Sequence, residues 1–287
     1  MSAERIRGHG RWLRRAAFAS IGAGVLLVAG CSNDKDIDIT TYATQTDPAD
    51  VLFNEGLANL KAGNLSEAGR KFEAVDQQHP YSDYAKRAIV LDAWVNYRQG
   101  NYTDAVAGGK RYLNLYPTDD DAAYAQYIIG LAYYKQIPDV TRDQTPARQT
   151  EQAMQALVDN YPKSEYVADA RQKIRFARNQ LAGKDMQVGR YYQERNQYLA
   201  AINRYKSVVQ TYPKTDQIEE ALARLVECYY ALGLTNEAQE AAAVLGHNYP
   251  QSEWYKDSYA LLEKNGLKPN DRGQTWLSRA GRMLGAS

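Results

Sequence analysis

Cysteine and histidine are both scarce in this sequence of 287 residues, which contains two cysteines and three histidines. The histidines are His9, His79 and His247, and nothing near them is spaced as a set of ligands. A metal site needs several convergent ligands, and a catalytic nucleophile needs a base beside it. We therefore predict no catalytic residues, no metal site and no cofactor, and a protein that is not an enzyme.

Long apolar runs are also missing. The apolar run at residues 16–29 has about fourteen residues, fewer than the roughly 20 that a helix needs to cross a bilayer. It follows five arginines and ends at Val28-Ala29-Gly30-Cys31, a lipobox, so residues 1–30 are predicted to be a lipoprotein signal peptide. Acyl chains on Cys31 would then anchor the chain in outer-membrane lipid on the periplasmic face. Ser32 favours the outer membrane, because an aspartate at this position often signals retention in the inner membrane.

A strong charge of either sign is absent as well. Without residues 1–30, which hold five arginines and one glutamate, 30 basic and 33 acidic residues remain, a net charge of −3. No strongly basic face is expected, which argues against a nucleic-acid partner. If Cys31 is lipidated, only Cys228 remains, so no intramolecular disulfide can form. Residues 31–48 are polar and aperiodic, and we interpret them as a flexible tether.

From Ala49 onward the sequence repeats itself around a recurring proline. The spacings between these prolines are 37, 45, 51 and 37 residues. Each proline is predicted to end one helix, and the Ser, Thr or Asp beyond it to cap the next. The acidic run after the second proline, Asp119 to Asp121, is interpreted in the same way as a solvated turn and helix cap. The prolines are Pro80, Pro117, Pro162, Pro213 and Pro250.

Counting back from each proline gives the tetratricopeptide pattern, in which small residues let two helices approach and large ones fill the gap between hairpins. We therefore predict an all-α fold, a superhelical stack of five tetratricopeptide-like helical hairpins. The paired small positions are Gly56 with Ala68, Ala93 with Ala105, Gly189 with Ala201, and Val226 with Ala238, and the large ones include Phe72, Tyr97, Tyr112, Tyr192, Tyr205 and Tyr229.

Two repeats carry additions. An inserted loop is predicted at residues 136–148 of the third repeat, and an extra helix at about 164–181 before the fourth. A closing helix is predicted near 253–264. The domain plan is therefore repeats one to three at 49–163, the extra helix with repeats four and five and the closing helix at 164–265, and a C-terminal tail at 266–287.

Three stretches of the chain carry a resemblance to a known family. They are residues 50–56, the inserted segment 143–148, and above all Leu181-Ala182-Gly183-Lys184 running into residues 188–195. The sequence resembles the BamD family, also called ComL, the repeat lipoproteins of the outer-membrane β-barrel assembly (BAM) machine. An alternative is another periplasmic repeat lipoprotein, such as a cell-envelope division coordinator, although the coiled coil usual there is absent. A murein-cleaving enzyme would need a separate catalytic domain, for which no stretch is left over.

The resemblance implies particular partners for each half. Unfolded outer-membrane β-barrel proteins would face the first three repeats, while the POTRA domains of BamA and the accessory BAM lipoproteins would face the last two. Candidate client-binding residues are Tyr81, Tyr84 and Tyr97, each of which could instead be a packing residue of its repeat. The segments 191–195 and 201–204 match the part of the family that meets BamA, and they give as candidates Tyr192, Glu194, Arg195 and Arg204. Arg204 should face solvent, either for a partner or as a solvated charge paired with Glu194 or an acid of the next repeat.

The tail carries a second amphipathic pattern. At helical spacing, Trp276, Leu277, Ala280, Met283 and Leu284 fall on one face. The segment is expected either to dock on a partner or a headgroup layer, or to form a disordered end.

Overall fold

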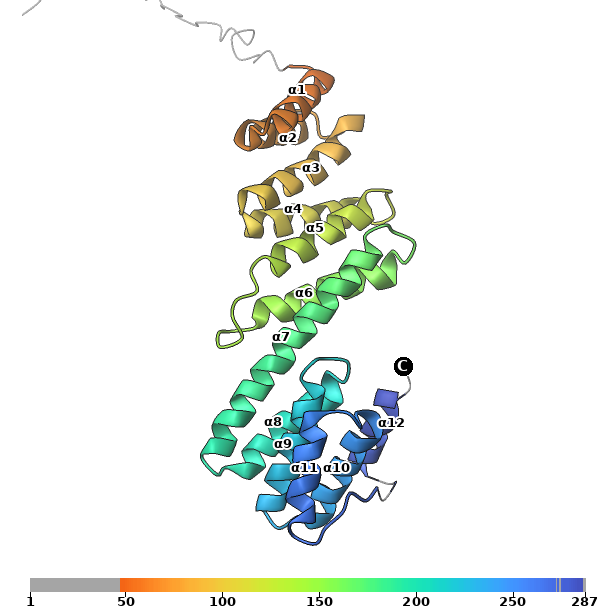
Figure 1. Cartoon of the computed structure of the whole chain (residues 1–287). Coiled ribbons are helices and arrows are strands. Elements are labelled where there is room, and N and C mark those ends of the chain that lie inside the picture. Colours follow the sequence, from red (N-terminus) through yellow and green to blue (C-terminus); the bar gives the residue numbers. More distant parts are fainter. Residues whose placement is uncertain (1–46, 272, 274, 286–287) are drawn as a thin grey trace, which may run out of the picture. The chain divides into compact units, whose positions relative to one another are not determined.

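The computed structural model describes residues 47–271, 273 and 275–285, so Cys31 and most of the tether lie outside the described residues. Every regular element among them is a helix (Figure 1). The helices are α1 (Ala49–Ala62), α2 (Leu65–Gln78), α3 (Asp83–Gln99), α4 (Tyr102–Leu115), α5 (Ala122–Tyr134), α6 (Thr145–Asn160), α7 (Val167–Glu194), α8 (Tyr198–Thr211), α9 (Ile218–Ala231), α10 (Thr235–Asn248), α11 (Glu253–Glu263) and α12 (Trp276–Gly285).

The helices form a stack of five hairpins. Each helix from α1 to α10 packs on the next one in sequence, and α11 closes the stack against α9 and α10 (Figure 1). The hairpins are α1 with α2, α3 with α4, α5 with α6, the second half of α7 with α8, and α9 with α10. The predicted all-α stack of tetratricopeptide-like hairpins is confirmed. Within the described ranges, no helix combines the length and the apolar character needed to span a bilayer.

Close packing within the hairpins explains the small residues of the repeat pattern. A Cβ atom added to Gly56 would lie 2.6 Å from the Phe72 ring, and one added to Gly189 would lie 2.4 Å from the Tyr205 ring. Such distances are below van der Waals contact, so a larger residue would force the two helices apart.

The recurring prolines end the second helix of each hairpin, as predicted. The residue before each proline closes the helix by donating its backbone N–H to the carbonyl four residues earlier, as Tyr116 does to Tyr112 at 2.8 Å. The predicted side-chain caps are wrong. Ser82 and Ser252 occupy the N-cap positions of α3 and α11 in extended conformations, but neither hydroxyl has a hydrogen-bond partner in the described part of the chain.

The predicted extra helix is present, but it has no end of its own. It continues through Leu181 into the first helix of the fourth hairpin, so α7 is a single helix of 28 residues. This segment contains no proline, and Gly183 costs only about 1 kcal/mol relative to alanine in a helix interior. Burial of Leu181, Ala182 and Met186 offsets that cost.

The inserted loop ends earlier than predicted, at Gln144, because Pro146 lies in the first turn of α6 rather than in the loop. Proline is well suited to that place, since the first turn leaves its backbone N–H groups without helical partners. The loop contacts the middle of α7, where the Lys184 ammonium donates to the carbonyl of Thr141 at 2.8 Å.

The tail forms a helix, α12, that packs on α10 of the same chain. Leu277 is 1% exposed and Ala280 is 2% exposed, whereas Met283 points outward. The hydroxyls of Thr275 and Ser278 both donate to the buried carboxylate of Glu240 on α10. The amphipathic face is confirmed except at Met283, but it covers the chain's own fifth repeat, an outcome that neither interpretation of the tail included.

Candidate functional site

A row of aromatic side chains crosses the face made by the first helices of the second and third hairpins and the start of α7. We call Trp94, Tyr97, Tyr124, Tyr127 and Tyr166 the aromatic row. Trp94 stacks on Tyr97 with 5.2 Å between ring centroids, and it lies 6.0 Å from Tyr124. Tyr166 then lies 5.5 Å from Tyr124 and stacks on Tyr127 at 4.7 Å. All five residues are partly exposed and also pack on the hydrophobic cores beneath them, so the row lies at the surface and not inside a core.

The aromatic row also carries polar groups. The Tyr127 hydroxyl donates to Asp169 at 2.7 Å, and Lys173 pairs with the same carboxylate at 2.5 Å. Burial raises the pKa of Tyr97, Tyr124, Tyr127 and Tyr166, so these hydroxyls stay protonated at neutral pH and remain donors. The row therefore offers ring faces together with hydroxyl groups.

The corresponding face of the C-terminal hairpins is built from ion pairs. Arg190 on α7 binds both oxygens of Glu220 on α9, at 2.7 and 2.8 Å. Arg224 lies 3.4 Å from Glu220 and donates to Glu227 at 2.9 Å, while its guanidinium lies 5.2 Å from the centre of the Trp254 ring on α11. We call these charged residues the ion-pair network.

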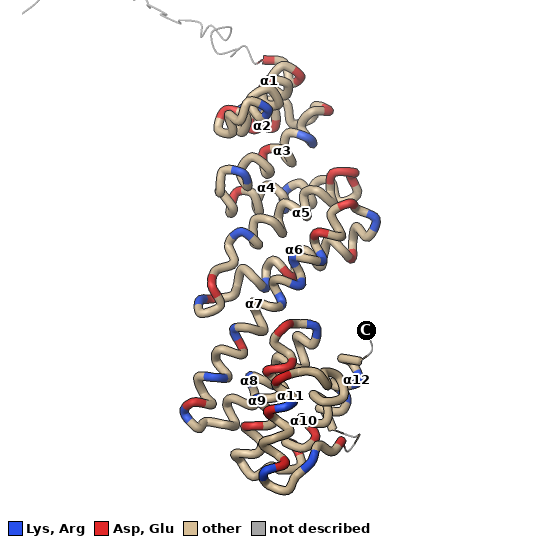
Figure 2. Tube along the Cα trace, viewed as in Figure 1, with Lys and Arg blue, Asp and Glu red and all other residues tan. Residues whose placement is uncertain are grey.

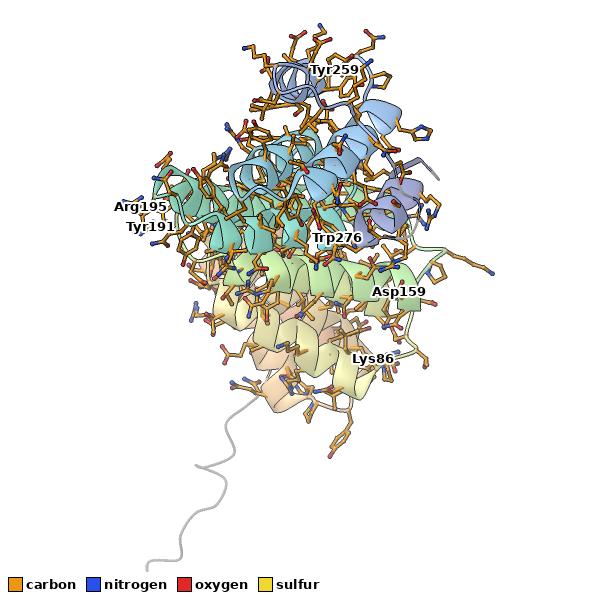
Figure 3. All side chains as sticks on the ribbon, turned by 90° about the horizontal axis from the view of Figure 1, so that it is seen from below. Lys86, Asp159, Tyr191, Arg195, Tyr259 and Trp276 are labelled. Carbon is orange, nitrogen blue, oxygen red and sulfur yellow. The ribbon has the colours of Figure 1, made fainter. Side chains whose placement is uncertain are left out.

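The edge of the fourth hairpin carries an exposed aromatic and arginine pair at the end of α7. Tyr191 is 52% exposed, and the Arg195 guanidinium lies 3.6 Å from its ring centre. Figure 3 shows both side chains projecting together from the edge of the fold. Tyr192 packs edge-on against Tyr191 at 5.6 Å, and Glu194 is exposed beside them. This edge joins three of the four residues predicted to contact BamA.

Arg204, the fourth of those residues, lies elsewhere. Its guanidinium donates to Asp185 on α7 at 3.3 Å, and its side chain is 49% exposed. Asp185 precedes Arg195 by roughly 15 Å along the helix axis. Arg204 is thus solvent-facing, as predicted, but it is paired with an acid of the preceding helix and not with Glu194 or the next repeat.

The three predicted client-binding tyrosines are not brought together. Tyr81 is 100% exposed in the turn before α3, and Tyr84 packs on Phe53 with centroids 5.2 Å apart. Tyr97 lies at the other end of α3, about 20 Å away along its axis. Of the three, only Tyr97 belongs to the aromatic row.

Trp94, Tyr124, Tyr127 and Tyr166 were missed as candidates. Trp94 with Tyr97 and Tyr124 with Tyr127 are both aromatic pairs at a spacing of three residues in the first helices of successive repeats. Residues three apart share a helix face, so this signal was present in the sequence. Tyr166 precedes α7 and carried no such periodic signal.

No group of acidic, cysteine or histidine side chains in the described ranges is arranged to hold a metal ion. Cys228 is fully buried in the C-terminal core, and burial raises the pKa of its thiol, which leaves it an unreactive packing residue.

The stacked hairpins define a tetratricopeptide-type repeat protein, a class whose extended faces bind other polypeptides. The model of the YfiO family, described as an outer membrane lipoprotein, matches residues 45–245. Outer membrane protein assembly factor BamD of Caulobacter vibrioides is 41% identical over 242 residues, covering 84% of this chain and 79% of the relative. The BamD of Rickettsia prowazekii is 35% identical over 239 residues, covering 83% and 93%. The chain therefore belongs to the BamD family of outer membrane protein assembly factors, and the resemblance seen in the sequence is confirmed.

Proposed function

We propose that this chain is a lipid-anchored, non-enzymatic scaffold of the BAM complex that holds unfolded outer-membrane β-barrel proteins on one half and BamA on the other. The observation that carries the proposal is the contrast between the aromatic row and the edge around Tyr191 and Arg195. Two surfaces of different chemistry on one stack allow a client and a partner to be bound at the same time. The accessory BAM lipoproteins are assigned to the C-terminal hairpins.

The aromatic row is the proposed client site, within the client-binding segment 49–163 extended to Tyr166. Segments of barrel proteins alternate apolar and polar residues, so one side of an extended segment is apolar. Ring faces at spacings of about 5 to 6 Å give such a side continuous contact. Tyr97 keeps its predicted role, whereas Tyr81 and Tyr84 are given at most a peripheral one.

The proposed contact with BamA is the edge formed by Tyr191, Tyr192, Glu194 and Arg195, with Arg204 as an outlying member in the segment 164–265. Stacking on Tyr191 holds the Arg195 guanidinium in place, so less side-chain entropy is lost on binding. Arginine and tyrosine are enriched among the residues that dominate interface energies. A carboxylate on a POTRA domain would suit the planar donor fork of Arg195.

Cross-linking from single positions tests both assignments. A photo-reactive residue in place of Trp94 should capture barrel proteins, and one in place of Tyr191 should capture BamA. Asp257 on α11, which is exposed, provides a control position. Capture of BamA from Trp94, or of neither protein from either position, would contradict the assignment of the two surfaces.

Binding of a purified POTRA fragment tests the edge quantitatively. Arg195→Ala and Arg204→Glu should each weaken binding, Arg195→Ala by about 2 kcal/mol as for an interface hot spot. Arg175→Ala removes an exposed arginine from the same helix and serves as the matched control. Normal binding by Arg195→Ala, with unchanged melting temperature, would move the interface elsewhere.

Cys31 is the proposed lipid anchor. Cys31→Ser should leave an unprocessed or poorly anchored precursor, while the hairpin stack still folds because it does not include this residue. Metabolic labelling with palmitate should mark the original chain and not the variant. Equal labelling of both would exclude Cys31 as the acylated residue.

A further inference from the structure

A cleft of about 720 Å³ opens between the turn that joins α4 to α5 and the turn that joins α6 to α7. Three tyrosines line it, Tyr124, Tyr161 and Tyr166. The Tyr161 hydroxyl donates to the carbonyl of Pro117 at 3.2 Å and so ties the two turns together. Tyr124 and Tyr166 also belong to the aromatic row, which makes the cleft one end of that surface.

The cleft is strongly negative. Asp119, Asp120, Asp121 and Glu165 line it, against one lysine, Lys163. Figure 2 shows acidic residues gathered at these two neighbouring turns. Interpreting the acidic run only as a solvated turn and helix cap therefore left out its position beside the tyrosines.

One of the four carboxylates is already neutralised. Asp119 pairs with Lys86 at 2.7 Å and accepts the Tyr112 hydroxyl at 2.6 Å, and the Lys86 bond holds the pKa of Asp119 down at about 2. Among the described residues, no ion pair joins Asp120, Asp121 or Glu165 to a cation of the chain. Three carboxylates thus line the cleft without an ion pair of their own among the described residues, beside Lys163 and within electrostatic reach of Lys86.

The aromatic rings that line the cleft also favour a bound cation, in addition to its negative charge. The negative face of an aromatic ring attracts an ammonium or guanidinium group within about 6 Å. The chain makes this contact at several other places: Lys173 lies 5.1 Å from the Tyr134 ring centre, Arg98 lies 5.6 Å from Trp94, and Lys86 lies 5.8 Å from Tyr116. In the cleft, Tyr124 and Tyr166 lie beside carboxylates, and within the described part of the chain neither ring has a cation stacked on it.

We infer that this cleft receives a lysine or arginine side chain of the polypeptide segment whose apolar residues lie along the aromatic row. The inference rests on the proposed client role of the row and adds a chemical requirement to it. It also fixes how the bound segment is placed. Its basic residue lies in the cleft beside Tyr124 and Tyr166, and its apolar residues lie along the row toward Trp94 and Tyr97. A segment with a carboxylate at this place is repelled.

Three labelled peptides test the requirement with the full chain. They share the sequence Gly-Tyr-Gly-Tyr-Gly-Xaa-Gly-amide with the same uncharged fluorophore on the amino terminus and lysine, norleucine or glutamate at Xaa, and fluorescence anisotropy reports their binding. The lysine peptide should bind on the order of fivefold more tightly than the norleucine peptide, from one cation–π contact with a partly screened ion pair. The glutamate peptide should bind most weakly.

Variants of the cleft then identify the groups responsible. Asp121→Asn combined with Glu165→Gln removes two of the three unpaired carboxylates and should clearly reduce the preference for lysine, while Asp120 and the tyrosine rings keep a remainder and the norleucine peptide is unchanged. Lys163→Gln should tighten the lysine peptide about twofold to threefold, a gain that misfolding cannot produce. Asp257→Asn, which removes an exposed acid on α11, is the matched control and should change nothing.

The inference is overturned if lysine and norleucine peptides bind equally, if the double variant keeps the preference undiminished, or if no peptide binds. If both peptides bind equally and Trp94→Ala abolishes that binding, the cation site is rejected and the aromatic row remains as a binding surface. Failure of the client role itself is recognised separately, by cross-linking from position 94 that captures no barrel protein.

Discussion

The first helices of the N-terminal hairpins and those of the C-terminal hairpins present opposite chemistries on the same scaffold. The N-terminal face carries partly exposed rings, Trp94 to Tyr166, whereas the C-terminal face carries Arg190, Glu220 and Arg224 in mutual ion pairs. Packing between helices uses the same small and large positions in both halves. The rings also pack on the cores beneath them, but the pairing of small and large positions within hairpins is kept in both halves, so it leaves the chemistry of these face positions open to binding.

The cores differ as well. Among the described residues, a single hydrophobic cluster runs from Ala182 in α7 to Ala280 in α12, while the N-terminal hairpins divide into separate clusters. In a repeat protein each hairpin is stabilised mainly by its neighbours. We therefore expect local opening to be easier in the N-terminal half, where client segments are proposed to bind.

The largest effect is expected from a proline placed in α7, the helix that both halves share. Gly183→Pro should cost about 3 kcal/mol or more, since it removes a helical hydrogen bond and clashes with the preceding turn. The two halves should then melt in separate steps, as followed by calorimetry. Gly183→Ala is the control: its Cβ would lie 3.4 Å from Val140, an ordinary contact, so it should stabilise the fold by about 0.5 to 1 kcal/mol. One unchanged transition for the proline variant would show that α7 does not couple the halves.

A smaller change should affect the C-terminal half alone. Leu277→Ala empties a buried position under α12 and should cost roughly 2 kcal/mol, at the low end for a buried leucine because a terminal helix can undock. Hydrogen exchange should increase in α10 and α12 but not in α1 to α6. Met283→Ala, on the exposed side of the same helix, should have little effect. Equal exchange in both variants would mean that α12 is not held by its apolar face.

The N-terminal half should be sensitive to pH through Asp92 on α3. Burial, followed by repulsion from Glu73, Asp76 and Asp104, raises the pKa of Asp92 to about 6, against roughly 4 in an unfolded chain. The folded state therefore binds this proton more tightly, so its stabilising effect is complete below about pH 4 and is lost as the pH rises through 6.

Asp92→Asn should consequently stabilise the fold by on the order of 1 kcal/mol at pH 7.5, allowing for solvent screening, and should give no gain at pH 4. Urea titrations at the two pH values measure the difference, with the exposed Asp83→Asn as control. A gain that is the same at both pH values would show that ionisation of Asp92 is not its source.

The smallest effect is expected at Tyr81. Because its side chain is fully exposed, Tyr81→Ser should change stability by less than about 0.5 kcal/mol. Client binding should fall by less than twofold, whereas Trp94→Ala should weaken it clearly. If Tyr81→Ser weakens client binding as much as Trp94→Ala does, the client surface extends onto the turn before α3.

The sequence predicted the parts of the fold that repeat and was less accurate where the chain departs from the repeat. The positions of prolines and small residues predicted the hairpins, because each of these residues acts on the fold through local steric effects. The continuity of α7 depends on burial of Leu181 and Met186 against two different hairpins, and no local signal reports that. The candidate surfaces were found only in part, since Arg204 and Asp185 meet across 19 residues and the rings of the aromatic row meet across repeats.

Because α7 is uninterrupted, its length sets both the distance and the rotation between the two halves. One residue inserted in it would turn everything beyond by about 100° and advance it by about 1.5 Å, moving the edge at Tyr191 out of phase with the aromatic row. Seven residues would restore the phase to within roughly 20° while adding about 10 Å. Lengths of this helix in functional relatives should therefore change in double turns, if they change at all, so that the two surfaces keep their mutual orientation.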